Sequence, residues 1–212
     1  MTSPSVKPDL GLYQTKYLLR RLLRRMPGLQ NLSPNALSVL AFGPGLGAAY
    51  CLWQGWWMGA LLCILGRMVI NTLDGLVAEE FGKTSKLGAY LNRLPGEFTD
   101  LLIILALWPH GDPTWMLALL LLTSWVQMFG LLGLVAGGSV QSVGPCGQTD
   151  RLAWIGLGCL LAQFGLAVWH GGIPFLVAGC GLTLVLRIGR SIRELRALDR
   201  DRDRAAAISE TI

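Results

Sequence analysis

Six apolar stretches follow one another along most of the chain and constrain its fold more than any other feature. They occupy residues 36–53, 57–79, 87–108, 114–137, 152–169 and 173–189. Each is about as long as a helix that crosses a hydrocarbon layer of about 30 Å. Only 15% of the residues are charged, against about 25% in soluble domains. The sequence therefore predicts an all-α integral membrane protein with six transmembrane helices.

Lysine and arginine are distributed unequally between the segments that connect these stretches. Of the 18 Lys and Arg residues, Arg67 and Arg93 lie inside apolar stretches, which leaves 16 in the connections and the ends. Those 16 fall in the N-terminal segment, in 79–86, in 138–151 and in the tail from residue 187. The segments 54–55, 110–113 and 170–172 have none. By the positive-inside rule both termini are cytoplasmic, and the expected location is the bacterial inner membrane.

The two ends of the chain differ in charge pattern from the apolar middle. Residues 10–26 include the run LLRRLLRR, which suits an amphipathic helix lying on an anionic membrane surface. The tail mixes arginine with aspartate, which indicates a solvated helix end and no nucleic-acid partner. We therefore expect a cytoplasmic segment at 1–30 with that interfacial helix, a membrane domain at 31–190 and a charged cytoplasmic tail at 191–212.

Ionisable and amide side chains interrupt the second and third apolar stretches. Such groups are costly inside a membrane and indicate function by default. The second stretch contains Arg67, Asn71 and Asp74, and the third contains Asn92, Glu97 and Asp100. Because a short loop at 80–86 joins the two stretches, we expect an antiparallel hairpin. Counting outward from the loop places Asp74 level with Asn92, Asn71 level with 96–97, and Arg67 level with Asp100.

This register predicts one polar pocket that opens to the cytoplasm. Asn71, Asp74, Asn92 and Glu97 are expected to line it as metal ligands, and their oxygen atoms suit Mg²⁺ or Mn²⁺. Gly75 and Gly88 have no side chain, so a bulky ligand can approach the backbone there. Beneath the pocket, Arg67 and Asp100 are expected to form a buried ion pair. The alternative is that all these groups only join helix to helix by hydrogen bonds.

The segment from Asn71 to Glu97 resembles the signature of the CDP-alcohol phosphotransferases, D-x2-D-G-x2-A-R-x8-G-x3-D-x3-D. Asp74, Gly75, Ala78 and Gly88 match that signature with every spacing preserved. The residues Ser33 to Ser38, S-P-N-A-L-S, are similar to the T-P-N-x-x-T segment that precedes the family's first helix. The resemblance implies six helices, two divalent ions held by four aspartates, and binding of a CDP-linked donor by residues such as Asn35, Gly75, Ala78 and Gly88.

The chain departs from this signature at four positions. Asn71, Glu79, Asn92 and Gly96 stand where the family has its first aspartate, its arginine, its third aspartate and its fourth aspartate. The resemblance therefore implies a divergent member with a degenerate motif, for which one metal ion is more plausible than two. Glu97 follows the break that Pro95 and Gly96 make in the helix. We expect that break to turn Glu97 into the pocket as the replacement catalytic base, with Asp74 as the other catalytic carboxylate.

A second constellation lies before the fifth stretch, on the cytoplasmic side. Residues 144–151 read G-P-C-G-Q-T-D-R and resemble a G-P-x-G-K-x-D-R segment in an asparagine-bearing branch of the family. Arg151 is a candidate for binding a phosphate of the acceptor or of the lipid. The alternative is that Arg151 only anchors the orientation of the chain and that the glycines form a turn.

The expected function is that of a phospholipid-synthesis enzyme. It would transfer a phosphatidyl group from a CDP-linked donor such as CDP-diacylglycerol to an alcohol acceptor, release CMP, and use Mg²⁺ or Mn²⁺. The alternative is a catalytically inactive relative that binds a nucleotide-lipid or serves as a partner subunit. A transporter fits less well because the polar residues concentrate in one hairpin. Small-residue pairs at Gly43 and Gly47, and at Gly133 and Gly137, are compatible with a homodimer.

Overall fold

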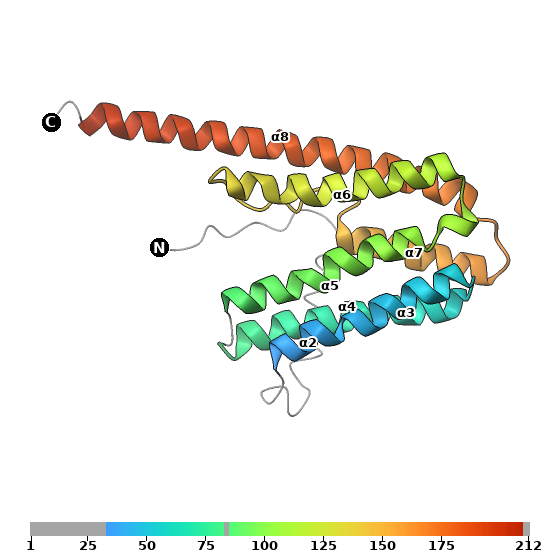
Figure 1. Ribbon diagram of the computed structural model, residues 1–212. Helices are drawn as coiled ribbons and strands as arrows, with labels where there is room; N and C mark the ends of the chain where they lie inside the picture. Colours follow the sequence, from blue (N-terminus) through green and yellow to red (C-terminus); the bar gives the residue numbers. More distant parts are fainter. Residues whose placement is uncertain (1–32, 83–84, 210–212) are drawn as a thin grey trace.

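The structure, a computed structural model, describes residues 33–82 and 85–209. Every regular element in these two ranges is a helix (Figure 1). The helices are α2 (Pro34–Leu40), α3 (Phe42–Trp53), α4 (Trp57–Glu80), α5 (Lys86–Leu105), the short η3 (Trp108–His110), α6 (Pro113–Val135), α7 (Gln148–Gln163) and α8 (Trp169–Ser209). The fold class predicted from the sequence is therefore confirmed as all-α.

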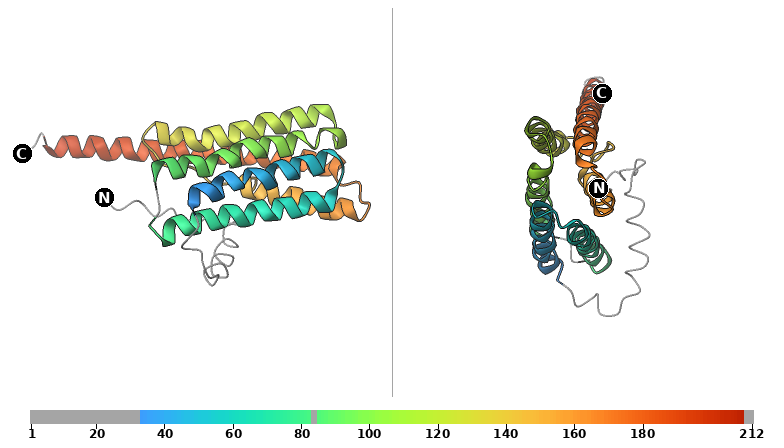
Figure 2. Two further views of the ribbon diagram at one scale, coloured as in Figure 1. Left: turned by 60° about the horizontal axis from the view of Figure 1, so that its bottom comes forward. Right: turned by 90° about the vertical axis from the view of Figure 1, so that its right-hand side faces the viewer.

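The long helices run side by side and form an elongated bundle, and α8 projects beyond it at its C-terminal end (Figures 1 and 2). α6 packs along α8, α3 packs along α4, and α7 packs against α4. Buried apolar side chains such as Leu52, Ile103 and Ile155 fill the space between them. Large apolar side chains also cover the outside, where Tyr90 is 63% exposed and Val185 is 67% exposed. Such a surface fits a lipid environment.

Four helical segments are long and apolar enough to cross a membrane. They are Pro34–Trp53, Trp57–Gly75, Pro113–Val135 and Trp169–Arg204. The other two long helices are less apolar or shorter. α5 carries five polar or charged residues from Asn92 to Asp100, and α7 has 16 residues. The protein is thus a helical membrane protein, and the count of six crossings stays a prediction. The surface helix expected at 10–26 lies outside the described residues.

The first apolar stretch, expected at 36–53 as one helix, is divided in two. α2 ends with Ala41 as its C-cap, and α3 begins at Phe42. Pro44 lies in the first turn of α3 and has no N–H to donate to the carbonyl of Leu40. The run of hydrogen bonds is therefore interrupted near Ala41, although both pieces remain apolar.

The break expected at 170–172 is also displaced. α7 ends at Gln163, α8 begins at Trp169, and the connection between them contains Gly165 at φ +80°. Glycine adopts this left-handed conformation without steric cost, so the turn forms there. Gly171 and Gly172 instead lie in the first turn of α8, which then continues through the expected tail boundary at 190.

The hairpin of α4 and α5 has a different packing from the one expected. The two helices touch each other only slightly, whereas α2 packs against both of them and α3 also packs against α5. Gly45 permits the close approach of α3 to α5, because a Cβ at that position would lie 2.6 Å from Thr99 Oγ1. Side chains of α2 therefore lie between the two polar helices that the sequence pairs directly.

Candidate functional site

Asp74 is held against the short helix α2. Its side chain is nearly buried, with the residue 3% exposed, and its Oδ2 accepts a short hydrogen bond from the hydroxyl of Ser38. The same hydroxyl lies 3.1 Å from the carbonyl oxygen of Pro34. A serine has a single O–H to donate, and a carboxylate is the stronger acceptor. Ser38, which stands at the end of the S-P-N-A-L-S segment, therefore fixes the position of the one carboxylate that matches the family signature.

The N-terminus of α5 approaches the N-terminus of α2. Ser33 caps α2 by accepting a hydrogen bond from Ala36 N, and Ser85 caps α5 by accepting one from Gly88 N at 2.9 Å. A Cβ at Gly88 would lie 3.2 Å from Asn35 Oδ1 and 2.9 Å from Ser85 Oγ. Glycine therefore allows this close contact without a shift of the Ser85 or Asn35 side chain, and it brings two of the predicted donor-binding residues together.

Four more predicted site residues are half-buried on α4 and α5. They are Asn71, Gly75 and Ala78 on α4 and Asn92 on α5. The spacing of three and four residues places Asn71, Asp74 and Ala78 on one face of α4. Partial exposure distinguishes these positions from Arg67, which lies deeper on the same helix and is 0% exposed.

Glu97 is half-buried one residue after the Pro95–Gly96 step. Its interacting neighbours are Asp100 and Arg93 of its own helix, Gln127 of α6 and Arg151 of α7. Glu97 therefore lies toward α6 and α7. Asp74, in contrast, contacts Ser38 of α2. The role of Glu97 as a base remains a prediction.

Gly96 stands where the family signature has its fourth aspartate. A Cβ at Gly96 would lie 2.9 Å from Gln148 Nε2, so the Gln148 side chain covers this face of α5. Arg67 Nη2 donates a hydrogen bond of 3.0 Å to the Gly96 carbonyl oxygen. A longer side chain at residue 96 would have to displace Gln148, which stands where the related G-P-x-G-K-x-D-R segment has lysine.

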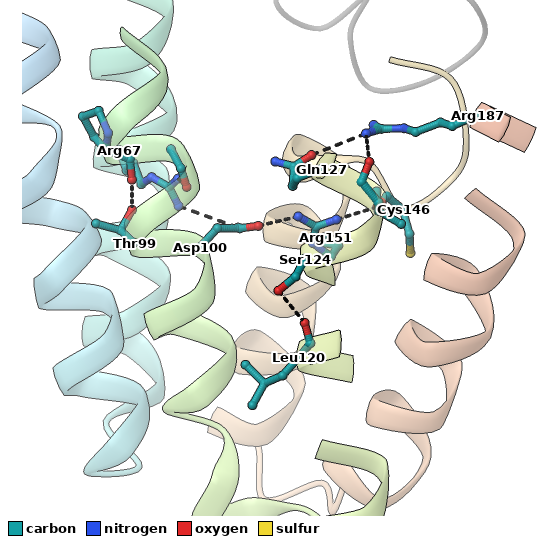
Figure 3. Close-up of polar contacts among 12 residues, drawn as sticks. Arg67, Thr99, Asp100, Leu120, Ser124, Gln127, Cys146, Arg151 and Arg187 are labelled. Atoms are coloured by element: carbon teal, nitrogen blue, oxygen red, sulfur yellow. Dashed lines mark hydrogen bonds and ion pairs between the residues drawn. The ribbon is translucent and has the colours of Figure 1, made fainter. Parts of the chain in front are cut away.

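Arg67, Asp100 and Arg151 form an ionic network (Figure 3), which contacts Gly96 through Arg67. Arg67 Nη1 lies 4.0 Å from Asp100 Oδ1, which confirms the ion pair expected from the helix register. Arg151 Nη2 forms a shorter ion pair with Asp100 Oδ2, and Arg151 Nη1 donates a hydrogen bond of 2.9 Å to the Cys146 carbonyl oxygen. All three charged side chains are at most 2% exposed. The network therefore joins α4, α5, α7 and the segment before α7.

The sequence did not indicate Arg151 as a member of this network. Its guanidinium group is occupied by Asp100 and by the Cys146 carbonyl, and the residue is 0% exposed. The phosphate-binding role expected for Arg151 remains a prediction. A signal was present in the sequence, because Asp150 and Arg151 begin an apolar stretch that has no other charge.

Arg187 is a third buried cation, which sequence reasoning assigned only to the basic tail. It is 5% exposed and donates to the Val126 carbonyl at 2.6 Å, to the Val143 carbonyl at 3.2 Å and to Gln127 Oε1 at 3.4 Å (Figure 3). A Cβ at Gly130 would lie 2.6 Å from Arg187 Nη1. Arg187 therefore joins α8 to α6 and to the loop before α7, near the neighbours of Glu97.

The donor set around Asp74 is oxygen-rich but carries little charge. Within the described ranges, no three His, Cys, Asp or Glu residues lie close enough to hold a metal ion together. The predicted metal ligands on α4 are one carboxylate, Asp74, and one amide, Asn71. Both offer hard oxygen atoms of the kind that Mg²⁺ and Mn²⁺ bind. The residues thus fit a divalent cation by ligand chemistry, with amides replacing most of the expected carboxylates.

Two curated bacterial proteins are similar to parts of the chain. Inner membrane protein YnbA of Escherichia coli (strain K12) is 32% identical over 104 residues, which cover 48% of this chain and 49% of that protein. The bifunctional IPC transferase and DIPP synthase of Aquifex aeolicus (strain VF5) is 32% identical over 83 residues, covering 39% of this chain and 19% of that protein. The chain therefore spans about half, or less, of the length of these relatives.

Solved structures of phosphatidylinositol phosphate synthase PgsA1 from Mycobacterium tuberculosis share the fold. The complex with manganese and citrate has a TM-score of 0.65 and 19% identity, covering 84% of this chain and 88% of that chain. The complex with CDP-DAG has a TM-score of 0.59 and 20% identity, with coverages of 86% and 92%. A family model described as CDP-alcohol phosphatidyltransferase matches residues 31–185, which include all of the predicted site residues. The chain belongs to the CDP-alcohol phosphatidyltransferase family.

Proposed function

We propose that this chain is a membrane transferase of phospholipid synthesis. It moves a phosphatidyl or similar substituted phosphate group from a CDP-linked donor to the hydroxyl group of an alcohol and releases CMP. The observation that carries the proposal is the fixed position of Asp74, which matches the signature and accepts a hydrogen bond from Ser38 of the S-P-N-A-L-S segment. Membership of the family and the CDP-DAG complex of the PgsA1 structure support it.

A divalent cation, Mg²⁺ or Mn²⁺, is proposed to be held by Asp74 and Asn71 with Asn92 and Glu97. When bound, it would neutralise charge on the pyrophosphate of the donor and on the departing CMP. One carboxylate and amide oxygens supply fewer negative charges than the four aspartates of the family signature. We therefore propose one cation in this site.

The donor is proposed to bind at the end of the bundle where α2, α4 and α5 meet. Gly75, Ala78 and Gly88 present little side chain there, so the polar head of the donor can approach the helix backbones. Asn35 lies beside Gly88 and offers an amide for hydrogen bonding. Arg151 is proposed to bind a phosphate of the acceptor or of the lipid, for which its guanidinium would have to give up part of its contact with Asp100 or with the Cys146 carbonyl.

Glu97 is proposed to take the proton from the acceptor hydroxyl. It is the half-buried carboxylate next to the Pro95–Gly96 step, and a base that contacts the acceptor contributes about 10²–10⁴ to rate. Substitution Glu97→Gln keeps the shape of the side chain and removes its basicity. Full metal-dependent turnover in that variant would exclude Glu97 as the base.

The proposed setting is the bacterial inner membrane. Six crossings with both termini and the site on the cytoplasmic side would follow the distribution of Lys and Arg, and the similarity to an inner membrane protein of E. coli agrees with the location. A homodimer and the interfacial helix at 10–26 are part of the same proposal. Cysteine accessibility to a membrane-impermeant reagent on intact cells would test the orientation.

An inactive relative that binds the nucleotide-lipid is the second candidate. The positions at which the chain departs from the family signature favour this candidate. The main one is Gly96, where Gln148 fills the space that a fourth aspartate would need. Such a protein would still bind a CDP-lipid with a cation at Asp74, but it would not release CMP.

The deciding experiment is CMP release by the purified full chain in lipid nanodiscs. CDP-diacylglycerol is the donor, Mg²⁺ or Mn²⁺ is supplied, and a panel of alcohols serves as acceptors. Asp74→Asn is compared with Asp112→Asn, a matched change at the exposed N-cap of α6. We expect release that needs metal, is lost in Asp74→Asn and is kept in Asp112→Asn. Metal-dependent binding of CDP-diacylglycerol without release from any acceptor would favour the inactive relative, and absence of both would contradict the two proposals.

A further inference from the structure

Four of the five cysteines lie in two close pairs that the candidate site does not use. Cys51 of α3 interacts with Cys63 of α4, and Cys146 interacts with Cys180 of α8. Cys159 of α7 is the fifth. The two pairs differ in accessibility, because Cys51 and Cys63 are half-buried whereas Cys146 and Cys180 are at most 1% exposed.

The Cys51–Cys63 pair lies in a symmetric contact between two antiparallel helices. A Cβ at Gly47 would lie 3.1 Å from Cys63 Sγ, and a Cβ at Gly59 would lie 3.0 Å from Cys51 Sγ. Each sulfur therefore occupies the space that a glycine of the opposite helix leaves open. Gly47 precedes Cys51 by one turn and Gly59 precedes Cys63 by one turn, so the contact repeats symmetrically about the turn at Gly55.

This packing brings the backbones of α3 and α4 close together at the two cysteines. Disulfides form when the Cα atoms are about 4.4–6.8 Å apart and the two side chains point at each other. Paired glycines permit such an approach of two helices, and the mutual contact of the thiols shows that the side chains converge. Gly55, at φ +71°, closes the connection tightly and holds the register.

The pair also lies at the end of the bundle opposite to Asp74. Cys51 is in the last turn of α3 and Cys63 is in the second turn of α4, next to the connection at 54–56. That connection carries no Lys or Arg, so the positive-inside rule places it away from the cytoplasm. Compartments on that side of a bacterial inner membrane are oxidising, and disulfides persist there.

We propose that Cys51 and Cys63 are a modification site at which a disulfide joins α3 to α4. The reaction is thiol–disulfide exchange with an external disulfide of the oxidising compartment. The Cys51 and Cys63 thiols lose two protons and two electrons and form one S–S bond, and the external disulfide is cleaved into two thiols. The bond closes the first helical hairpin at the end remote from the site, and it does not depend on the proposed transferase activity.

The experiment counts free thiols on the purified full chain in detergent, before and after exposure to oxidised glutathione. After oxidation, excess reagent is removed, and the unfolded chain is treated with a maleimide that carries a polyethylene glycol. We expect five labels on the reduced chain and three on the oxidised chain, since two of the five cysteines are consumed. Intact mass should fall by two hydrogen atoms, and a cross-linked peptide should contain Cys51 and Cys63.

Single variants identify the pair. Cys51→Ser and Cys63→Ser should each show four labels before and after oxidation. Cys146→Ser and Cys159→Ser are matched controls and should still lose two labels on oxidation, from four to two. The proposal is overturned if the wild-type chain keeps five labels, if glutathione adducts replace the cross-link, or if Cys51→Ser still loses two labels. The peptide identified from the wild-type chain decides the outcome even where a variant does not fold.

Discussion

Two aspartates, Asp74 and Asp100, lie in the interior of the same bundle but in contrasting surroundings. Both residues are at most 3% exposed. Asp100 lies between the guanidinium groups of Arg67 and Arg151, which are themselves 0% exposed. Asp74 accepts a hydrogen bond from the hydroxyl of Ser38, and the polar residues on its face of α4 are half-buried.

The contrast separates a structural cluster from a candidate binding site. A buried charge is stable only when it is paired and hydrogen-bonded, and Asp100 is paired with two guanidinium groups within the protein. On the helix that carries Asp74, the neighbouring positions Asn71 and Gly75 are half-buried, so part of their surface is accessible. Intramembrane charge alone therefore does not mark function, whereas the exposure of the residues around the charge does distinguish the two cases.

The largest expected effect is on stability and comes from Asp100→Ala. The substitution leaves two buried guanidinium groups without their shared carboxylate, and breaking such a pair costs about 3–5 kcal/mol. Thermal unfolding of the purified chain in detergent should show a strongly lowered midpoint. A matched change, Asp112→Ala at the exposed N-cap of α6, should cost about 1 kcal/mol. Equal midpoints for the wild-type and Asp100→Ala chains would show that the network does not hold the bundle together.

Asp74→Asn should lower activity strongly and change stability little, which is the reverse of the effect expected for Asp100→Ala. Metal-dependent CMP release should fall by at least about 100-fold, because even supporting contacts of a metal ligand affect activity by 10–100-fold. The amide can still accept a hydrogen bond from Ser38, so the unfolding free energy should change by less than about 1 kcal/mol. The same sample of each variant should be used for both assays. If Asp74→Asn lowers the midpoint of thermal unfolding as much as Asp100→Ala does, the two aspartates do not differ in their structural role.

Ser38→Ala should have an intermediate effect on activity. It removes a hydrogen bond to a charged group, which is worth about 1.5–3 kcal/mol, and so frees the Asp74 side chain to turn away from α2. Turnover should fall by about 10-fold or more, with a higher metal concentration needed for half-maximal rate. Ser38→Thr keeps the hydroxyl and serves as the control. Equal metal dependence in Ser38→Ala and Ser38→Thr would mean that Ser38 does not orient the carboxylate.

Much of the helical fold could be predicted from the sequence, because the length of an apolar stretch and the charge of the adjoining loops depend only on residues close together in the chain. The stretches at 57–79, 87–108 and 114–137 correspond closely to α4, α5 and α6. The helix boundaries that were predicted wrongly lie near a proline, Pro44, and near a glycine, Gly165. Pro44 interrupts an apolar run without changing its hydropathy, and the Gly165 turn was hidden inside an expected span.

The site was only partly predictable for a reason of packing. Matching depths along a hairpin correctly paired Arg67 with Asp100. It did not reveal that α2 packs against both helices or that Arg151 comes from a helix distant in sequence. Those contacts depend on the order of helices around the bundle, which periodicity along a single helix does not encode.

The smallest expected effect tests the approach of α2 to α5 at Gly88. In Gly88→Ala, the new methyl group meets Asn35 Oδ1 at 3.2 Å and Ser85 Oγ at 2.9 Å, so both side chains must move. Alanine also favours a helix over glycine by about 1 kcal/mol, which offsets the cost of crowding and leaves stability nearly unchanged. Half-saturation for the CDP-linked donor should rise a few-fold. Gly43→Ala is the matched control, because a Cβ there meets nothing within 4 Å. If Gly88→Ala binds the donor as well as Gly43→Ala does, the donor does not use the end of the bundle where α2 and α5 meet.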